Sequence, residues 1–272
     1  MKTVLTIAGS DCSGGAGIQA DIKTMIMNGV YAMSAITALT AQNTTGVYGI
    51  QETSSEFLDN QLDCIFTDIF PDAVKIGMLS SSEIMRHVAS KLRQYQARHI
   101  VLDPVMVSTS GHKLIEDDAI AALTDDLMPL TSLITPNLRE AEVLTDHPIN
   151  NVEEMKSAAL ELLKFGCKAV LLKGGHLEGG LMCDVLQIAG ESTPHLFTST
   201  KIESPNTHGT GCTLSSAIAT FLALGYVMPQ AVERAKRYVT HGIEAGKDIR
   251  IGEGHGPLNH FYHPVPMNIK EE

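Results

Sequence analysis

Short runs of apolar, mostly β-branched residues recur along the chain, and turn-forming residues bound each run. The runs occupy residues 4–8, 35–39, 73–76, 99–102, 133–135 and 169–172. Continuous apolar runs of this length are typical of strands that are buried on both faces of a parallel sheet. Segments with apolar positions at helical spacing lie between them, at residues 18–27, 57–66, 83–95, 118–127 and 155–165. This βαβα order predicts an open, mostly parallel sheet with helices on both faces, a three-layer α/β/α architecture.

The second half of the chain departs from this alternation. Residues 182–188 and 194–200 are two further apolar stretches without a helix between them, so we expect an antiparallel pair at an edge of the sheet. Residues 210–224 and 229–247 then predict two consecutive helices. No linker, repeat or low-complexity segment interrupts residues 1–272, and we therefore expect a single domain.

Composition and charge exclude several classes of protein. The 20 basic and 31 acidic residues give a net charge of −11, which is the wrong sign for nonspecific binding of nucleic acid. The five cysteines have no CxxC or other close metal-ligand spacing, as expected for reduced thiols in a cytoplasmic protein. The apolar runs at 3–8 and 217–228 are too short for a signal peptide or a membrane span, so we expect no membrane partner.

Ligands of open α/β sheets bind outside the carboxyl ends of the strands. The informative loops are therefore residues 9–17, 78–82, 103–111 and 136–140, together with the glycine-rich turn before Thr213. Because the chain is acidic overall, an anionic ligand has to be held by local groups such as backbone amides, lysines or a metal ion.

The turn His208-Gly209-Thr210-Gly211-Cys212-Thr213 precedes a run of small and apolar residues with helical character. Its glycines allow successive amides to point into one concavity at a helix N-terminus, where a phosphate binds favourably. A thiol in this position can have a lowered pKa and act as a base, which makes Cys212 a candidate catalytic residue. The alternative is a tight turn that leads into a buried helix.

Oxygen-bearing side chains follow two other predicted strands. Asn137 and Glu140 lie three residues apart at the start of a predicted helix, and Asp103 follows the strand ending at Leu102. These residues are candidates to hold Mg²⁺ directly or through water. The alternatives are helix capping by Asn137 and Glu140 and an Asp-Pro turn at residues 103–104.

Two glycine-containing loops remain. Residues 15–20 match G-x-G-x-x-A, but the acidic residue that a dinucleotide-binding fold needs after its second strand is absent, which makes a dehydrogenase a weak hypothesis. Small residues in this loop instead permit close approach to a flat ligand. Lys173, before two glycines, can bring an ammonium to a nucleotide phosphate or can simply be solvated. No P-loop motif is present.

Taken together, these motifs resemble the ribokinase-like superfamily and, within it, the hydroxymethylpyrimidine/phosphomethylpyrimidine kinases of thiamin biosynthesis. The resemblance covers nearly the whole chain, and its most specific block is residues 206–213. The other matching blocks are residues 6–11, 14–21, 40–44, 75–79, 103–106, 135–137 and 173–176.

The resemblance implies a role for each candidate residue. Gln42 hydrogen-bonds the aminopyrimidine edge, because its amide offers both a donor and an acceptor. The residues implied to line that pocket are Gly9, Ala16, Asp21 and Met78. Gly209, Thr210, Gly211 and Cys212 form the anion hole, and Cys212 replaces the aspartate base of most ribokinase relatives. Lys173 lies near ATP, and Asp103, Asn137 and Glu140 surround Mg²⁺.

The implied enzyme is a homodimer that phosphorylates a pyrimidine alcohol twice with ATP, first on its hydroxymethyl group and then on the new monophosphate. A pyridoxal kinase of the same superfamily is the nearest alternative, since its substrate is also a flat ring with a CH₂OH group. A non-catalytic protein that binds a pyrimidine or a nucleotide is the alternative from another class. The composition of residues 106–113 suggests a lid over the substrate.

Overall fold

The computed structural model describes residues 1–106, 117–174 and 181–267, and in this part of the chain one nine-stranded sheet runs in the order β3-β2-β1-β4-β5-β6-β7-β8-β9. The neighbouring strands from β2 through β1, β4, β5 and β6 to β7 pair in parallel, whereas β3, β8 and β9 pair antiparallel at the two edges. The predicted open, mostly parallel sheet is therefore confirmed. Its strands are β1 (Thr3–Asp11), β2 (Tyr31–Asn43), β3 (Gly46–Glu52), β4 (Ala73–Ile76), β5 (Ile100–Leu102), β6 (Leu133–Ile134), β7 (Ala169–Leu172), β8 (Leu181–Ile188) and β9 (His195–Thr200).

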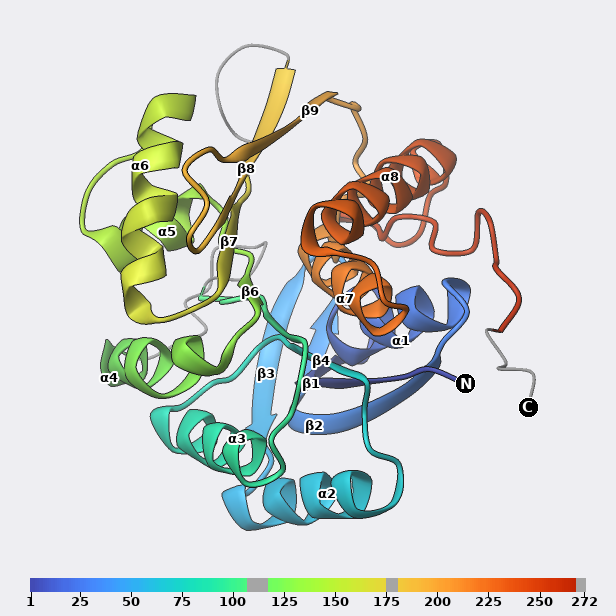
Figure 1. The fold of residues 1–272 in the computed structure, drawn as a ribbon. Helices are drawn as coiled ribbons and strands as arrows, with labels where there is room; N and C mark the ends of the chain where they lie inside the picture. The colour runs from blue at the N-terminus through green and yellow to red at the C-terminus, as the bar shows by residue number, and fades with distance from the viewer. Residues whose placement is uncertain (107–116, 175–180, 268–272) are drawn as a thin grey trace.

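Helices cover both faces of this sheet (Figure 1). The helices are α1 (Gly17–Met27), α2 (Ser55–Asp68), α3 (Ser82–Gln94), α4 (Asp117–Ala122), α5 (Leu138–Thr145), α6 (Val152–Leu162), α7 (Thr210–Ala223) and α8 (Met228–Gly246). Helices α1, α7 and α8 share one apolar core with the sheet, and α2 to α6 share the core on the other face. Alternate residues of the central strands supply the two cores, which gives the three layers expected from the sequence.

The expectation of an unbroken βαβα order is wrong at one point. β2 continues through a short turn into β3, and the two strands form an antiparallel hairpin at the sheet edge. Residues 48–52 of β3 are exposed, so this strand has no buried apolar run that the sequence pattern could reveal. By contrast, the antiparallel pair β8 and β9 is confirmed at the opposite edge.

Two features of β1 and β2 shape the loops above the sheet. The β1–β2 register shifts between Ala8 and Ser10, and the β2–β3 register shifts between Ala41 and Gln42. Such bulges bend a strand and redirect its side chains. Both irregularities lie near the carboxyl ends of their strands, beside the candidate site. Within the described residues, no helix is long and apolar enough to traverse a bilayer.

Candidate active site

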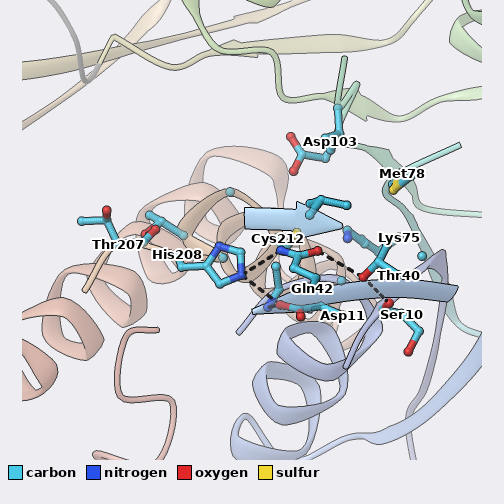
Figure 2. Close-up of a pocket in the computed structure, with 18 of the residues that line it drawn as sticks. Ser10, Asp11, Thr40, Gln42, Lys75, Met78, Asp103, Thr207, His208 and Cys212 are labelled. Atoms are coloured by element: carbon cyan, nitrogen blue, oxygen red, sulfur yellow. Dashed lines mark hydrogen bonds and ion pairs between the residues drawn. The ribbon is translucent and has the colours of Figure 1, made fainter. Parts of the chain in front are cut away.

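A cavity of about 190 Å³ opens at the carboxyl ends of the central strands, beside the N-terminus of α7 (Figure 2). Its wall contains all of the predicted site residues except Asp21 and Asn137. These are Gly9, Ala16, Gln42, Met78, Asp103, Glu140, Lys173, Gly209, Thr210, Gly211 and Cys212. Segments that are far apart in the sequence therefore meet in one place, as expected for the switch region of an open α/β sheet.

The turn at Gly209 requires glycine at this position. Gly209 has φ +79°, and a β-carbon there would lie 1.9 Å from the carbonyl oxygen of Gly15. The turn is thus pressed against the loop after β1, and Thr213 N donates to Gly209 O over 2.8 Å to close the first turn of α7. The amides of Gly211 and Cys212 belong to this first turn, where a helix provides no carbonyl acceptor, so they are suited to an anion.

Cys212 lines the cavity, but its thiol does not have the lowered pKa that its place at a helix N-terminus suggests. Burial raises the pKa of the Cys212 thiol to about 11, although the charge of Lys75 acts in the opposite direction. Asp21 and Asp103 add to the increase. Desolvation therefore outweighs the nearby ammonium, and the expectation of a lowered pKa is wrong for the free protein.

Lys75 is a cavity residue that the sequence reasoning missed. It lies in the middle of β4, and its fully buried ammonium contacts both carboxylate oxygens of Asp21, at 2.8 and 2.9 Å. Although burial opposes it, the pKa of Lys75 is raised, first by Asp21 and then by Cys212 and Asp103. A lysine inside the apolar run 73–76 was the available signal, because a charge is seldom buried without a partner.

Asp21 lies beneath the cavity and not in its wall. Its carboxylate is fully buried, and it accepts hydrogen bonds from Thr6 and Ser216, both at 2.6 Å, in addition to Lys75. With every approach occupied by protein groups, Asp21 holds Lys75 in place and is not available to a ligand. The expectation that Asp21 lines the pocket is replaced by this indirect position.

A second lysine is paired across the same cavity. Lys173 follows β7, and its Nζ lies 3.0 Å from Asp103 Oδ1, which also accepts from Thr135 Oγ1 at 3.1 Å. Burial alone would lower the pKa of Lys173, but the charges of Asp103 and then Glu140 outweigh this effect and raise the pKa. A β-carbon on Gly211 would lie 3.3 Å from Asp103 Oδ2 and 3.6 Å from Lys173 Nζ. This pair therefore lies directly beside the glycine turn.

Asn137 and Glu140 form a capping box at the start of α5. Asn137 N donates to Glu140 Oε2 at 2.8 Å, and Glu140 N donates to Asn137 Oδ1 at 3.0 Å. Capping, which the sequence left open, is thus the observed role of Asn137, whose side chain does not line the cavity. Glu140 does line it, and burial raises the pKa of this carboxyl to about 7, with Lys173 opposing and Asp103 contributing.

The remaining predicted pocket residues surround the loop after β1. A β-carbon on Gly9 would lie 3.2 Å from Met78 Sδ, so these two residues are direct neighbours. Ala16 stands at the N-terminus of α1, and its amide donates to Asp11 Oδ2 at 2.9 Å. Of the predicted lid, residues 106–113, only Met106 lies among the described residues, and its side chain is buried.

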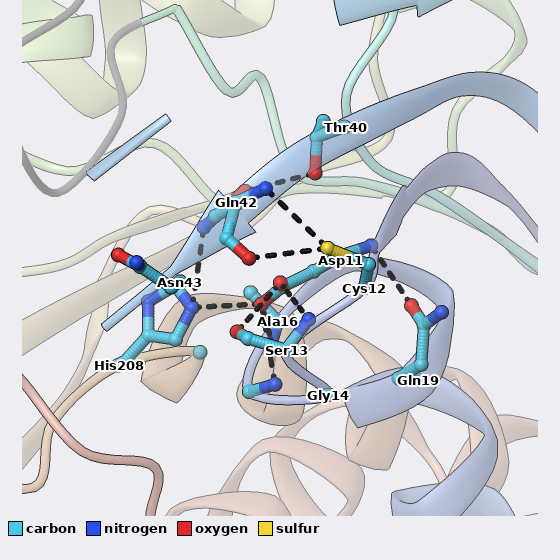
Figure 3. A network of polar contacts seen from close by, with 12 residues as sticks. Asp11, Cys12, Ser13, Gly14, Ala16, Gln19, Thr40, Gln42, Asn43 and His208 are labelled. Atoms are coloured by element: carbon cyan, nitrogen blue, oxygen red, sulfur yellow. Dashed lines mark hydrogen bonds and ion pairs between the residues drawn. The ribbon is translucent and has the colours of Figure 1, made fainter. Parts of the chain in front are cut away.

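Gln42 is held in a polar network that also was not foreseen (Figure 3). Its amide lies between Thr40 Oγ1, at 3.1 Å, and His208 Nε2, at 3.3 Å. His208 Nε2 in turn lies 2.9 Å from Asp11 Oδ2. Although burial opposes it, hydrogen bonds from His208 and Ser13 lower the pKa of Asp11 to about 2. The network connects β2, the carboxyl end of β1 and the turn before α7.

Comparison with known proteins identifies relatives of this chain. The family model described as phosphomethylpyrimidine kinase matches residues 11–259. A hydroxymethylpyrimidine/phosphomethylpyrimidine kinase from Rhizobium meliloti is 47% identical, over 95% of this chain and 96% of that protein. The thiamine biosynthesis bifunctional protein ThiED from Geobacter sulfurreducens is 50% identical over 95% of this chain, which spans 52% of that longer protein.

Solved structures agree with the sequence comparison. The phosphomethylpyrimidine kinase of Clostridium difficile 630 superimposes with a TM-score of 0.80 at 45% identity, covering 89% of this chain and 100% of that one. A pyridoxal kinase from Staphylococcus aureus, solved with AMP-PCP and pyridoxal, gives a TM-score of 0.88 at 32% identity, covering 98% and 96%. The matching family model and the relatives that align along their full length lead to one conclusion: the chain belongs to the phosphomethylpyrimidine kinase family.

Proposed function

We propose that this protein uses ATP to phosphorylate 4-amino-5-hydroxymethyl-2-methylpyrimidine, first to the monophosphate and then to the diphosphate, for thiamin biosynthesis. One observation carries the proposal: the glycine turn 209–212 and the Gln42 amide line the same cavity. The turn is suited to a phosphoryl group, and the amide is suited to the edge of an aminopyrimidine.

Positioning and charge stabilisation account for most of the chemistry that we assign to the site. In the first transfer, the substrate's hydroxymethyl oxygen attacks the γ-phosphorus, the bond from that phosphorus to the bridging oxygen breaks, and ADP leaves with the electron pair. The amides of Gly211 and Cys212, with Lys75 and Lys173, supply fixed positive charge for the oxygens of the transferred group. Lys173 is the candidate contact for ATP.

The two transfers make different demands on a base. A primary alcohol has to lose its proton, whereas a phosphate monoester, with a second pKa of about 6, is already an anionic nucleophile at neutral pH. Cys212 is our candidate for the group that takes the proton of the alcohol. Because the pKa of Cys212 is raised to about 11 in the free protein, only a small fraction of this side chain is present at neutral pH as the thiolate that can act as a base.

The donors of the cavity fit Mg²⁺, which prefers oxygen ligands and often binds through one or two carboxylates, water and substrate phosphates. Among the described residues, Asp103 Oδ2 accepts no hydrogen bond from the protein, and Glu140 lines the same cavity. We propose that these two carboxylates hold the ion, while Asn137 keeps Glu140 oriented through the capping box. When bound, Mg²⁺ would neutralise charge on the β- and γ-phosphates of ATP.

We also propose a homodimer in the cytoplasm. The outer hairpin β2–β3 exposes large apolar side chains, including Leu39, Tyr48 and Ile50, and apolar surface of this kind favours association. Light scattering on the purified protein would test the proposal, since a mass near 29.3 kDa would indicate a monomer. The single-domain organisation stays a prediction from the sequence.

The activity itself is tested by a coupled assay with Mg·ATP, in which the pyrimidine alcohol and pyridoxal are offered in parallel and the mono- and diphosphate products are separated. Formation of pyrimidine diphosphate supports the proposal. Pyridoxal phosphate as the sole product would transfer the assignment to the function named for the Staphylococcus aureus structure. The absence of both products would contradict the proposed reaction and favour a binding protein.

A further inference from the structure

The hydroxyl of Thr40 lies between two oxygens that compete for its single hydrogen. Thr40 Oγ1 is 2.9 Å from the carbonyl oxygen of Ser10 and 3.1 Å from Gln42 Oε1. Ser10 O is a backbone carbonyl and can only accept, whereas the Gln42 amide can present either its oxygen or its NH₂ group. The hydroxyl hydrogen therefore goes to Ser10 O, which is also the nearer of the two oxygens. Thr40 Oγ1 is then left with lone pairs on the side of Gln42, and these require a donor.

The same conflict occurs at the other end of the Gln42 amide. Gln42 Nε2 faces His208 Nε2 at 3.3 Å, and His208 Nε2 faces Asp11 Oδ2 at 2.9 Å. The Asp11 carboxylate also accepts from the amides of Ser13, Gly15 and Ala16. Because the Asp11 carboxylate accepts, His208 Nε2 has to carry a hydrogen. That nitrogen then has no lone pair to accept from the N–H of the Gln42 amide.

We propose that the working orientation of Gln42 is the one with its amide turned over, so that the NH₂ group faces Thr40 and the oxygen faces His208. The two amide atoms are nearly equal in size, and the hydrogen-bond network therefore decides between the orientations. In the turned orientation Thr40 accepts from Gln42, and the hydrogen on His208 Nε2 is shared between Asp11 and the Gln42 oxygen. The acceptors at the two ends, Ser10 O and Asp11, fix the donor-to-acceptor direction of every hydrogen bond between them.

This arrangement makes Thr40 and His208 positioning residues that set what Gln42 presents to a ring, an inference that rests on the proposed function. The amide offers one N–H on the Thr40 side and one oxygen lone pair on the His208 side. An aminopyrimidine presents the complementary pair, a ring nitrogen that accepts and an exocyclic amine that donates. The 4-oxo analogue has an N–H in place of the ring nitrogen and a C=O in place of the amine. It presents the reverse pair and is rejected.

The first experiment measures binding of both rings by calorimetry, which does not depend on turnover. The probes are 4-amino-5-hydroxymethyl-2-methylpyrimidine and its 4-oxo analogue. We expect the amino ring to bind about 100-fold more tightly, because the wrong ring meets two mismatched polar groups. Equal affinities, or the absence of binding of either ring, would overturn the inference.

Thr40→Val removes the acceptor on one side of the amide at nearly constant shape. The ratio of the two affinities should fall about tenfold, since one of the two constraints on the amide is lost. Thr40→Ser should restore the ratio. Thr37→Val is the matched control, because Thr37 lies on the same strand and its hydroxyl donates to Met78 O, at 2.8 Å. If Thr40 had a structural role alone, Thr40→Val would weaken the binding of both rings equally. The ratio of the two affinities would then be unchanged, which would overturn the inference.

Nitrogen NMR of the histidine-labelled protein provides a readout that is independent of ligands. His208 should carry a hydrogen on Nε2, and the tautomer with a hydrogen on Nδ1 alone would overturn the inference. The proposed function is tested separately. Discrimination between the rings without phosphoryl transfer would support the orientation of Gln42 and contradict the kinase activity. Conversely, diphosphate formation without discrimination would keep the kinase and remove the fixed orientation.

Discussion

Lys75 and Asp21 form a fully buried ion pair between β4 and α1, in which the ammonium contacts both carboxylate oxygens within 2.9 Å. Hydrogen bonds from Thr6 and Ser216 complete the surroundings of the carboxylate. Lys75 lines the cavity with Asp21 beneath it, and the pair places a positive charge close to Cys212. One interaction therefore serves both the core beneath α7 and the electrostatics of the site.

Lys75→Met should lower the free energy of unfolding by about 3–5 kcal/mol, because it leaves the Asp21 carboxylate buried without its partner. The double variant Lys75→Met/Asp21→Leu should recover most of this loss, since no charge is then left unpaired. Chemical denaturation of each variant measures the effect.

Lys156→Met is the surface control, because Lys156 pairs with an exposed Glu153, and its cost should stay below about 1 kcal/mol. A single Lys75→Met variant as stable as the double variant would contradict the interpretation of a compensated buried pair.

Gly209→Ala should reduce kcat at least about 100-fold, the usual effect of disturbing one donor of an anion hole. The substitution adds a β-carbon 1.9 Å from Gly15 O, and the turn has to move. Gly225→Ala is the matched control, since Gly225 also has a positive φ, +94°, but no heavy atom lies within 4 Å of the added carbon. That control should cost about 1 kcal/mol of stability and leave kcat unchanged. Steady-state rates and unfolding curves of both variants decide the matter, and similar losses of kcat would refute a specific role for the turn.

The parallel core of the fold could be predicted because its strands are buried on both faces. The predicted run 73–76 coincides with β4, and 169–172 coincides with β7. β3 was missed for the opposite reason: its residues 48–52 are exposed, and its apolar residues, Val47, Tyr48 and Ile50, do not form the continuous apolar run that marks a buried strand. Patterns of hydrophobic residues report burial, and an edge strand with two exposed faces is not buried.

The site followed the same logic. Loops at the carboxyl ends of parallel strands meet at one edge, so the residues of those loops could be brought together from the sequence alone. The environment of each group could not. The raised pKa of Cys212 depends on burial and on carboxylates that come from other segments, and the network of Asp11, Gln42 and His208 joins residues up to 197 positions apart.

His260 should make the protein less stable in mild acid. Burial lowers the pKa of His260 to about 4, with a smaller contribution from Lys23, whereas an unfolded histidine titrates near 6.5. Between pH 6.5 and 4 the unfolded chain binds a proton that the folded chain excludes. The stabilisation is therefore complete above pH 6.5 and is lost as the pH falls, by up to about 3 kcal/mol.

The variant His260→Gln isolates this contribution. Glutamine does not titrate, and its amide can still reach the hydroxyl of Thr213, which lies 2.9 Å from His260 Nε2. Denaturation curves between pH 4 and 7 should show a shallower loss of stability for the variant than for the parent protein. Parallel curves for the two proteins would show that another group titrates in this range.

Cys212→Ala should impair the first phosphoryl transfer much more than the second, because only the alcohol has to lose a proton. The raised pKa, about 11, adds a pH signature. If the thiolate is the base, the single-turnover rate of the first transfer in the parent protein should rise about tenfold per pH unit between pH 7 and 9, as the thiolate fraction rises. This slope should disappear in Cys212→Ala, and the second transfer should lack it in both proteins. Rapid-quench experiments that start from the alcohol and from the monophosphate separate the two steps. Equal losses in both steps, or an unchanged slope, would mean that the Cys212 thiolate does not take the proton of the alcohol.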